Sequence, residues 1–276
     1  MSPDVKIKAQ VYKDPRPAEV FEPYHARVRD HPPEWVYEAV RLTTVLTALT
    51  FFRAQGFGSE NVPNGPVILA PNHASFMDHF FAGAFIRRHV QFMAKSQMFG
   101  RQPLSWVYSH GGVFPVRRGF HDEEAFITAF EILDRGGAIG MYVEGGRSRT
   151  GEVSNDAKAG IGRLAIESGA PVVPVAILGS HQVRNWKRLR FPKVIVRYGR
   201  PVRFARHRQS TREQQQQVAD EILRRIREMH VELAAAGSRG AGRLARERAA
   251  ADRAATDRAA TDAAGDQTGD RTAAAI

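Results

Sequence analysis

A histidine and an aspartate five positions apart are the first residues whose types could do chemistry together. His73 and Asp78 lie in the heptapeptide 72–78 (NHASFMD), directly after the apolar run 67–70. A neutral imidazole beside a carboxylate can act as a general base toward a hydroxyl group. Residues five apart lie about 140° apart around an ideal helix, so the two side chains can meet only at a turn between a strand and a helix. The alternative is that Ser75 and Asp78 merely cap a helix and that His73 is a loop residue.

Two further stretches carry groups that bind anions. The stretch 111–119 (GGVFPVRRG) has two arginines after an apolar run, and 142–151 (YVEGGRSRTG) has a carboxylate, a glycine pair and two arginines. In an open α/β sheet, ligands bind at the carboxyl ends of the strands. Arginine binds phosphate through two hydrogen bonds, and glycine allows backbone N–H groups to approach an anion. Together with the heptapeptide, these stretches favour a phosphate site over three unrelated basic turns.

In this combination the sequence resembles the glycerolipid acyltransferase family, in particular the 1-acylglycerol-3-phosphate acyltransferases. Four blocks typical of that family occur in order, and the resemblance covers about residues 60–205. The blocks are NHASFMD at 72–78, GGVFPVRRG at 111–119, VEGGRSRTG at 143–151 and APVVPVAI at 170–177.

The resemblance implies a role for each matching residue. The histidine is the base and the aspartate its partner, and Glu144 orients an arginine or accepts a hydrogen bond from a glycerol hydroxyl. The acyl donor, acyl-CoA or acyl carrier protein, is a substrate, so neither a cofactor nor a metal is expected. The implied residues are His73 and Asp78 for catalysis, Lys95, Arg117, Glu144, Gly145, Gly146 and Arg147 for the acceptor phosphate, and Val173, Pro174 and Val175 for the acyl-donor wall.

One departure from the family pattern leaves the acceptor open. Enzymes that act on the lysophosphatidic acceptor usually carry E-G-T-R-S, whereas residues 144–148 read E-G-G-R-S. We therefore expect acyl transfer to 1-acylglycerol 3-phosphate, forming phosphatidic acid in phospholipid biosynthesis, with glycerol 3-phosphate or another lysophospholipid as alternative acceptors. A remote alternative is a non-catalytic basic protein that binds membranes or nucleic acid.

Composition narrows the chemistry further. The chain of 276 residues has no cysteine, which excludes a thiolate nucleophile, and it lacks the G-x-S-x-G serine elbow. Direct transfer between two bound substrates is therefore favoured over an acyl-enzyme. The formal charge of +11 indicates an anionic partner. No zinc finger, recognition-helix pattern or aromatic platform supports nucleic acid, so none is expected.

The elements that must position these residues follow from apolar runs that alternate with helical patterns. The alternation predicts an α/β fold, and we expect a single mixed-sheet acyltransferase domain with the H-x4-D motif at a strand-to-helix turn, preceded by an N-terminal hydrophobic helix. The expected strands are 67–70, 91–94, 113–116, 138–143, 172–178 and 194–196.

The chain divides into three parts. Residues 1–58 form an N-terminal segment with a membrane-associating helix at about 34–53, whose uncharged run 42–52 is too short to span a bilayer. That helix either packs on the body or enters one leaflet. Residues 59–236 form the acyltransferase domain, which ends in a helix opened by a capping box at Ser210 and Glu213.

The last 40 residues differ from the rest. The segment 237–276 holds 14 alanines and no aromatic residue, so we expect a low-complexity Ala/Arg/Asp tail that is solvated and dispensable.

The stretch 168–212 carries 11 Lys and Arg residues and no acid. This excess of positive charge suggests contact with an anionic membrane surface or with coenzyme A phosphates, unless the stretch is a solvated strand edge. The N-terminus lacks an apolar signal region, so we expect a peripheral or monotopic protein at the cytoplasmic face of the cell membrane.

Overall fold

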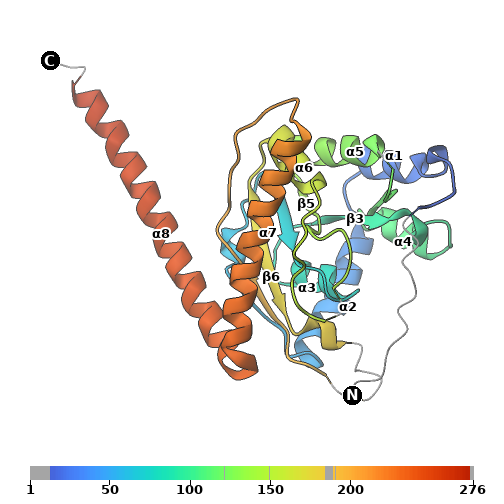
Figure 1. Ribbon diagram of the computed structural model, residues 1–276, viewed down its shortest axis with the longest axis horizontal. Coiled ribbons are helices and arrows are strands. Elements are labelled where there is room, and N and C mark those ends of the chain that lie inside the picture. The colour runs from blue at the N-terminus through green and yellow to red at the C-terminus, as the bar shows by residue number, and fades with distance from the viewer. Residues whose placement is uncertain (1–12, 121, 149, 184–188, 190, 274–276) are drawn as a thin grey trace.

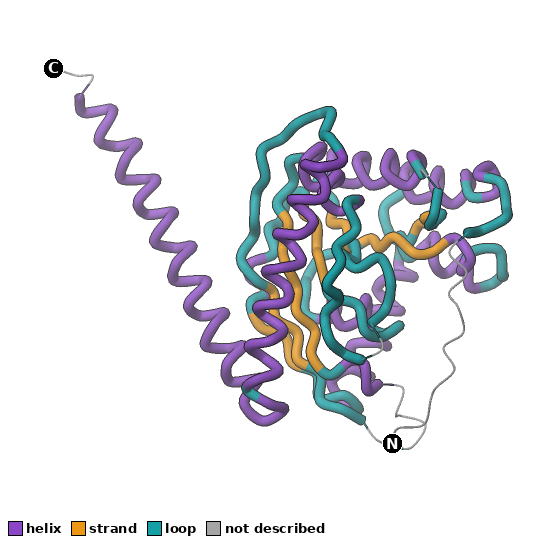
Figure 2. The backbone as a smooth tube through the Cα atoms, in the orientation of Figure 1, coloured by secondary structure: helices purple, strands orange, loops and turns teal. Residues whose placement is uncertain are grey.

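A seven-stranded mixed sheet forms the centre of the protein. The computed structural model describes residues 13–120, 122–148, 150–183, 189 and 191–273 (Figure 1). The strand order is β1-β7-β6-β2-β5-β3-β4, and β6 and β7 pair antiparallel while the other neighbouring pairs are parallel. Figure 2 shows these strands in orange at the centre of the body, between helices. The predicted α/β class and mixed sheet are therefore confirmed. The strands are β1 (Gln55–Phe57), β2 (Val67–Pro71), β3 (Gln91–Lys95), β4 (Phe114–Val116), β5 (Ala138–Gly140), β6 (Val172–Leu178) and β7 (Ile195–Tyr198).

Helices cover both faces of this sheet, as Figure 1 shows. On one face α7 packs across β6 and against α6, and on the other α2 packs on α3. The α-helices are α1 (Glu22–Asp30), α2 (Trp35–Thr50), α3 (Asp78–Ala84), α4 (Leu104–His110), α5 (Glu123–Asp134), α6 (Gly160–Ser168), α7 (Arg212–Ala235) and α8 (Gly237–Ala273), with short 3-10 turns at Ala18–Val20, Ser59–Asn61 and Ser96–Met98.

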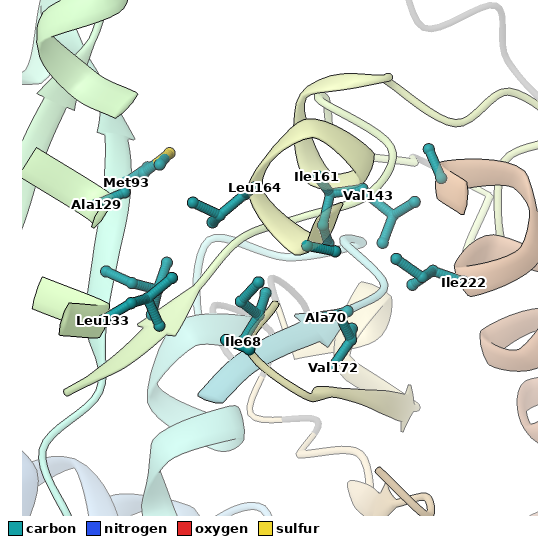
Figure 3. Packing of buried hydrophobic residues seen from close by; sticks show 14 of the residues in the cluster. Ile68, Ala70, Met93, Ala129, Leu133, Val143, Ile161, Leu164, Val172 and Ile222 are labelled. Atoms are coloured by element: carbon teal, nitrogen blue, oxygen red, sulfur yellow. The ribbon is translucent and has the colours of Figure 1, made fainter. Parts of the chain in front are cut away.

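Alternate residues of the central strand β2 supply two separate cores. Ile68 and Ala70 pack with Ile222 of α7 on one face (Figure 3), whereas Val67 and Leu69 pack with α2 and α3 on the other. Successive side chains of a strand point to opposite faces, so a strand covered on both sides must be apolar throughout. All five residues of β2 are buried, so the strand is held in place and so is the start of the loop that follows its carboxyl end.

A close helix contact explains the glycine-rich start of α6. A Cβ atom on Gly162 would lie 1.8 Å from the Gln215 carbonyl oxygen of α7. Only glycine therefore allows α6 and α7 to approach this closely. The capping box that opens α7 lies one residue later than predicted, at Thr211 and Gln214, while the Ser210 hydroxyl donates to Glu167.

The prediction of a solvated tail is wrong for its first half. The chain turns at Gly237 (φ +64°) and continues as α8, which lies against α7 and the β1–β7 edge of the sheet. Ala241 and Ala245 are fully buried against Ile195 and Leu233. Alanines four residues apart share one helix face, and their small size lets the helix lie close to the sheet. Figure 1 shows the rest of α8 extending away from the body.

The N-terminal hydrophobic helix packs on the body, which is one of the two alternatives that the sequence left open. Val36 and Ala48 of α2 are buried, and Ala48 packs in the core beside α3. Large apolar side chains on its outer side are exposed, with 71% of Trp35 and 61% of Leu42 accessible. Among the described residues, none of the helices has both the length and the hydrophobicity that crossing a bilayer requires.

Candidate active site

A cavity of about 260 Å³ lies where the carboxyl ends of β2, β3 and β5 and the start of the loop after β4 converge. The parallel strands bring residues that are far apart in sequence to the same edge of the sheet, as the rule for α/β sheets predicts. Its wall combines polar and apolar side chains. The polar lining is His73, His79, Lys95, Tyr108, Arg118, Tyr142 and Arg147, and the apolar lining is Phe76, Phe92, Met93, Ala94, Met98 and Val113.

His73 and Asp78 meet at the turn between β2 and α3, as their spacing predicts. Asp78 is the first residue of α3 and is fully buried, and its Oδ2 atom lies 2.9 Å from His73 Nδ1. The same oxygen accepts hydrogen bonds from the backbone amides of Ala74 and Ser75 at 2.7 and 2.6 Å. Asp78 therefore shapes the loop and also orients the imidazole. An ionised carboxylate can only accept, so Nδ1 carries the proton and Nε2 is available as a base.

Tyr142 holds the other side of the imidazole. Its ring stacks on that of His73 with 3.8 Å between the centroids and 18° between the planes. Burial lowers the pKa of His73 below its ordinary value, Asp78 opposes this shift, and Arg147 and Arg118 add to it. The histidine is consequently neutral near pH 7, which a general base requires.

Two loops are joined at the backbone of His73. The Glu144 Oε1 atom accepts from the His73 amide at 2.7 Å, and the Ser148 amide donates to the His73 carbonyl at 2.7 Å. Glu144 Oε2 accepts from the Ser154 amide at 3.1 Å. Within the described part of the chain, Glu144 thus bonds to backbone amides and to no arginine side chain, and it does not line the cavity, which differs from the role predicted for it.

Asn72 anchors the start of the same loop to the neighbouring strand. Its side chain donates to the Ile177 carbonyl at 3.1 Å and accepts from the Ile177 amide at 2.7 Å. These bonds continue the pairing of β2 with β6 past the end of the ladder. The sequence analysis placed Asn72 inside the first block but gave it no role.

Among the described residues, three cations line the cavity, and one of them differs from the prediction. Lys95 and Arg147 lie there as expected, but the third is Arg118 and not Arg117. The Arg117 guanidinium instead donates to the Arg16 carbonyl at 3.0 Å and lies over the Phe120 ring. Two adjacent arginines after a short strand point in different directions, so their order alone could not show which one reaches the cavity.

The charges act on one another. Burial lowers the pKa of the Lys95 ammonium, and the neighbouring Arg147 and Arg118 lower it further. Three cations that repel one another in a partly buried space are stabilised when an anion binds between them. The arrangement therefore suits a phosphate group beside the base.

Comparison with known proteins bears on this geometry. Residues 55–178 match the Acyltransferase family model. The resemblance to glycerolipid acyltransferases is therefore confirmed for the part of the chain that carries the four blocks. A chloroplastic 1-acyl-sn-glycerol-3-phosphate acyltransferase of Brassica napus is 25% identical over 147 residues, which are 52% of this chain and 42% of that protein, so the match spans less than half of the relative.

A solved structure has the same fold. The crystal structure of the 1-acyl-sn-glycerophosphate acyltransferase PlsC from Thermotoga maritima aligns with a TM-score of 0.53 at 23% identity, covering 78% of this chain and 89% of that one. The alignment extends well beyond the residues of the family match. It supports the mixed sheet and the helices that cover it as the fold of this chain.

The glycine pair and the fourth block lie beside the cavity and not in its wall. Gly145 has a φ of +63°, and a Cβ atom there would lie 2.6 Å from Lys158, so the turn that carries Arg147 to the cavity needs a glycine. Gly146 follows in the same turn. Within the fourth block, Val173, Pro174 and Val175 are buried in β6 and pair with β2. They belong to the core of the sheet and do not line this cavity, so the predicted donor wall stays a prediction.

Proposed function

We propose that the protein transfers an acyl chain from acyl-CoA or acyl carrier protein to the free glycerol hydroxyl of 1-acylglycerol 3-phosphate, forming phosphatidic acid. One observation carries this proposal. The oriented, neutral His73 lies in a cavity that is lined by three cations and by the apolar side chains of Phe76, Met93 and Met98. A lysophosphatidic acceptor has a phosphate and an acyl chain that match these two kinds of lining, and it carries the hydroxyl that His73 would deprotonate.

The transfer balances with the groups present. His73 Nε2 takes the proton of the acceptor hydroxyl as its oxygen attacks the thioester carbonyl carbon. The new C–O bond forms, the C–S bond breaks, and the proton leaves His73 to the departing thiolate. A thiol has a pKa near 8.5, so its sulfur leaves at modest cost. Fixing the phosphate with Arg118 and Arg147 holds the hydroxyl near Nε2, and such positioning can supply roughly 7–11 kcal/mol of the barrier.

Glycerol 3-phosphate is the alternative acceptor. The E-G-G-R-S sequence at 144–148 favours it, because this motif is commoner among the glycerol-3-phosphate acyltransferases of the family that the sequence resembles. The apolar lining of the cavity favours the lysophosphatidic acceptor, because glycerol 3-phosphate has no acyl chain to contact it. We place the first acceptor above the second on this ground.

The exposed face of α2 supports work at an anionic membrane surface. Trp35, Leu42, Leu46 and Leu49 follow one another along one side of the helix, and each is about half exposed or more. The ring centroids of Trp35 and of Trp106 in α4 lie 6.5 Å apart. Tyr108 of the same helix α4 lines the cavity. An apolar face that adjoins the cavity gives a lipid acceptor a short path from the bilayer. Placement on the cytoplasmic side stays a prediction.

Purified full-length protein with several acceptors tests this proposal. Palmitoyl-CoA and palmitoyl acyl carrier protein are each supplied with 1-oleoylglycerol 3-phosphate, glycerol 3-phosphate or 1-oleoylglycerophosphocholine, and the products are measured by mass spectrometry. We expect phosphatidic acid as the main product. Preferred turnover of glycerol 3-phosphate would replace the first acceptor by the second, and absence of acyl transfer to all three acceptors would overturn the function.

A further inference from the structure

Arg227 of α7 contacts the loop that follows β5, far in sequence from the four blocks. Its Nη2 atom donates a hydrogen bond of 2.6 Å to the Ser154 carbonyl. The Ser154 amide donates to Glu144 Oε2 at 3.1 Å, and Glu144 Oε1 accepts from the His73 amide at 2.7 Å. A continuous path of three hydrogen bonds therefore runs from the middle of α7 to the backbone of the proposed base.

We propose that Arg227 is a positioning residue for acyl transfer, acting on His73 through Ser154 and Glu144. This inference rests on the proposed function, because it gives Arg227 a part in the same reaction. It goes beyond the matched family region, which ends at residue 178, and adds α7 to the elements that set the geometry of the site.

The charge of Arg227 supports the carboxylate in the middle of the path. Glu144 is 6% exposed, and burial raises the pKa of its carboxyl group. Asp78 raises this pKa further, whereas the two backbone amides and Arg227 lower it. Glu144 accepts from the two amides through its two oxygens, which is strongest when the carboxyl group is ionised, and a guanidinium stays positive at every working pH. Arg227 therefore helps to keep Glu144 in the form that fixes the His73 backbone.

The contacts of Arg227 indicate that it contributes little to stability. Its Nε atom is buried and has no hydrogen-bond partner within the described part of the chain. A buried donor without a partner costs free energy, which offsets part of the gain from the bond to Ser154. Replacement of the side chain should therefore change the position of the loop more than the stability of the fold.

Substitution of Arg227 in the full-length protein separates positioning from binding. Arg227→Gln removes the charge, Arg227→Lys keeps it and keeps a donor, and Arg224→Gln is the matched control, because Arg224 is an exposed arginine on the same helix that pairs with Glu221 and Glu228. We expect kcat of Arg227→Gln to fall roughly tenfold to hundredfold, with KM for both substrates within about twofold of wild type.

The controls make this expectation specific. Arg227→Lys should recover most of the lost kcat, and Arg224→Gln should match wild type. A kcat of Arg227→Gln equal to wild type would overturn the proposal. A raised acceptor KM at unchanged kcat would also overturn it, because that result would place Arg227 in binding.

Coupling between Arg227 and Glu144 provides a second test. In Glu144→Gln the carboxylate at the centre is lost, so Arg227 has nothing left to act through. The double variant should then be about as slow as the slower single variant. If the two losses of kcat instead multiply, Arg227 and Glu144 act independently and the path does not operate.

Amide hydrogen exchange tests the path without any reference to acyl transfer. In Arg227→Gln the amides of 72–79 should exchange about tenfold faster than in wild type and in Arg224→Gln, while those of the buried strand 67–70 should not change. Equal exchange at 72–79 in all three proteins would overturn the proposal. If wild type transfers no acyl chain to any acceptor, the proposed function fails, and the exchange result still shows whether Arg227 fixes the His73 loop.

Discussion

The pKa of His73 is set by opposing effects at one imidazole. Burial lowers it, the Asp78 carboxylate raises it, and Arg147 and Arg118 lower it. The base must be neutral, so kcat/KM should be constant at neutral pH and should fall only below the ordinary histidine pKa of about 6.5. Arg147→Gln removes one of the effects that lower the pKa, so its acid limb should move to higher pH. The measurement is the pH dependence of kcat/KM for both proteins, and an acid limb that moves to lower pH would contradict this account.

His73 and Asp78 should respond differently to substitution, although both belong to the proposed catalytic pair. His73→Ala removes the base, and activity should fall about 10²- to 10⁴-fold while thermal unfolding changes little. Asp78 Oδ2 also accepts from two backbone amides, so Asp78→Asn should lose activity and about 1–3 kcal/mol of unfolding free energy. Activity assays and thermal melts on both variants check this. Wild-type activity in His73→Ala would exclude its role as the base.

Arg117 and Arg118 are adjacent, but the structure gives them separate roles. Arg118→Lys should raise the acceptor KM several-fold, because lysine keeps the charge but not the two parallel donors. Arg117→Lys should leave the acceptor KM unchanged and lower the melting temperature, because the Arg117 guanidinium holds the backbone of the N-terminal segment at Arg16. Steady-state kinetics with both substrates and a thermal melt distinguish the two. The opposite pattern would restore Arg117 as the phosphate ligand.

At the scale of elements, the sequence predicted the central strands and the turn that joins His73 to Asp78. It missed the edge strand β1 and the end of β5. The apolar runs of β2 and β6 are continuous because helices bury both of their faces, so composition alone reveals them. β1 has three half-buried residues and gives no such pattern. The predicted strand 138–143 ends at Gly140, since the chain leaves the ladder to carry Tyr142 and Glu144 toward His73.

The directions of side chains in the site could be predicted from the sequence only in part. The H-x4-D spacing specifies a contact between His73 and Asp78, because only one local turn can bring them together. It could not show which of two adjacent arginines enters the cavity, or that Glu144 bonds to the backbone, because these depend on tertiary packing. The ion pairs of the buried Arg197 with Glu232 and Asp252 could not be predicted from the sequence either, since they join β7 to the two helices α7 and α8.

The packing of α8 leads to a prediction about stability. Ala245 is fully buried against β7 and α7, so Ala245→Leu should overpack this contact and cost about 1–3 kcal/mol of unfolding free energy. Ala251→Leu is the matched control, because Ala251 is exposed on the same helix and should change the melting temperature little. Equal melts for the two variants would mean that α8 does not rest on the sheet edge in solution.

At the scale of the whole molecule, charge and apolar surface are separated in a way that suits a lipid interface. The cations that surround the base lie inside a cavity, and the exposed apolar residues of α2 lie outside it and adjoin α4. Part of the basic stretch 168–212 stabilises the fold instead, as Arg197 does through its ion pair with Glu232. Residues 184–188 of this stretch, which include Trp186, lie outside the described residues. The apolar face of α2 is therefore the feature on which membrane binding should depend most.

Charges placed on that face should weaken membrane binding without damaging the active site. Leu46 and Leu49 are 54% and 47% exposed, and each leucine that enters a bilayer contributes about 1.5–3 kcal/mol. The double variant Leu46→Glu with Leu49→Glu should therefore bind anionic vesicles at least roughly a hundredfold more weakly in a sedimentation assay. Val231→Glu is the control, because Val231 is 58% exposed on α7, on the other side of the sheet. Its binding should equal that of wild type, and turnover of a water-soluble short-chain acceptor should be unchanged in both proteins. Full vesicle binding by the double variant would mean that another surface holds the protein to the membrane.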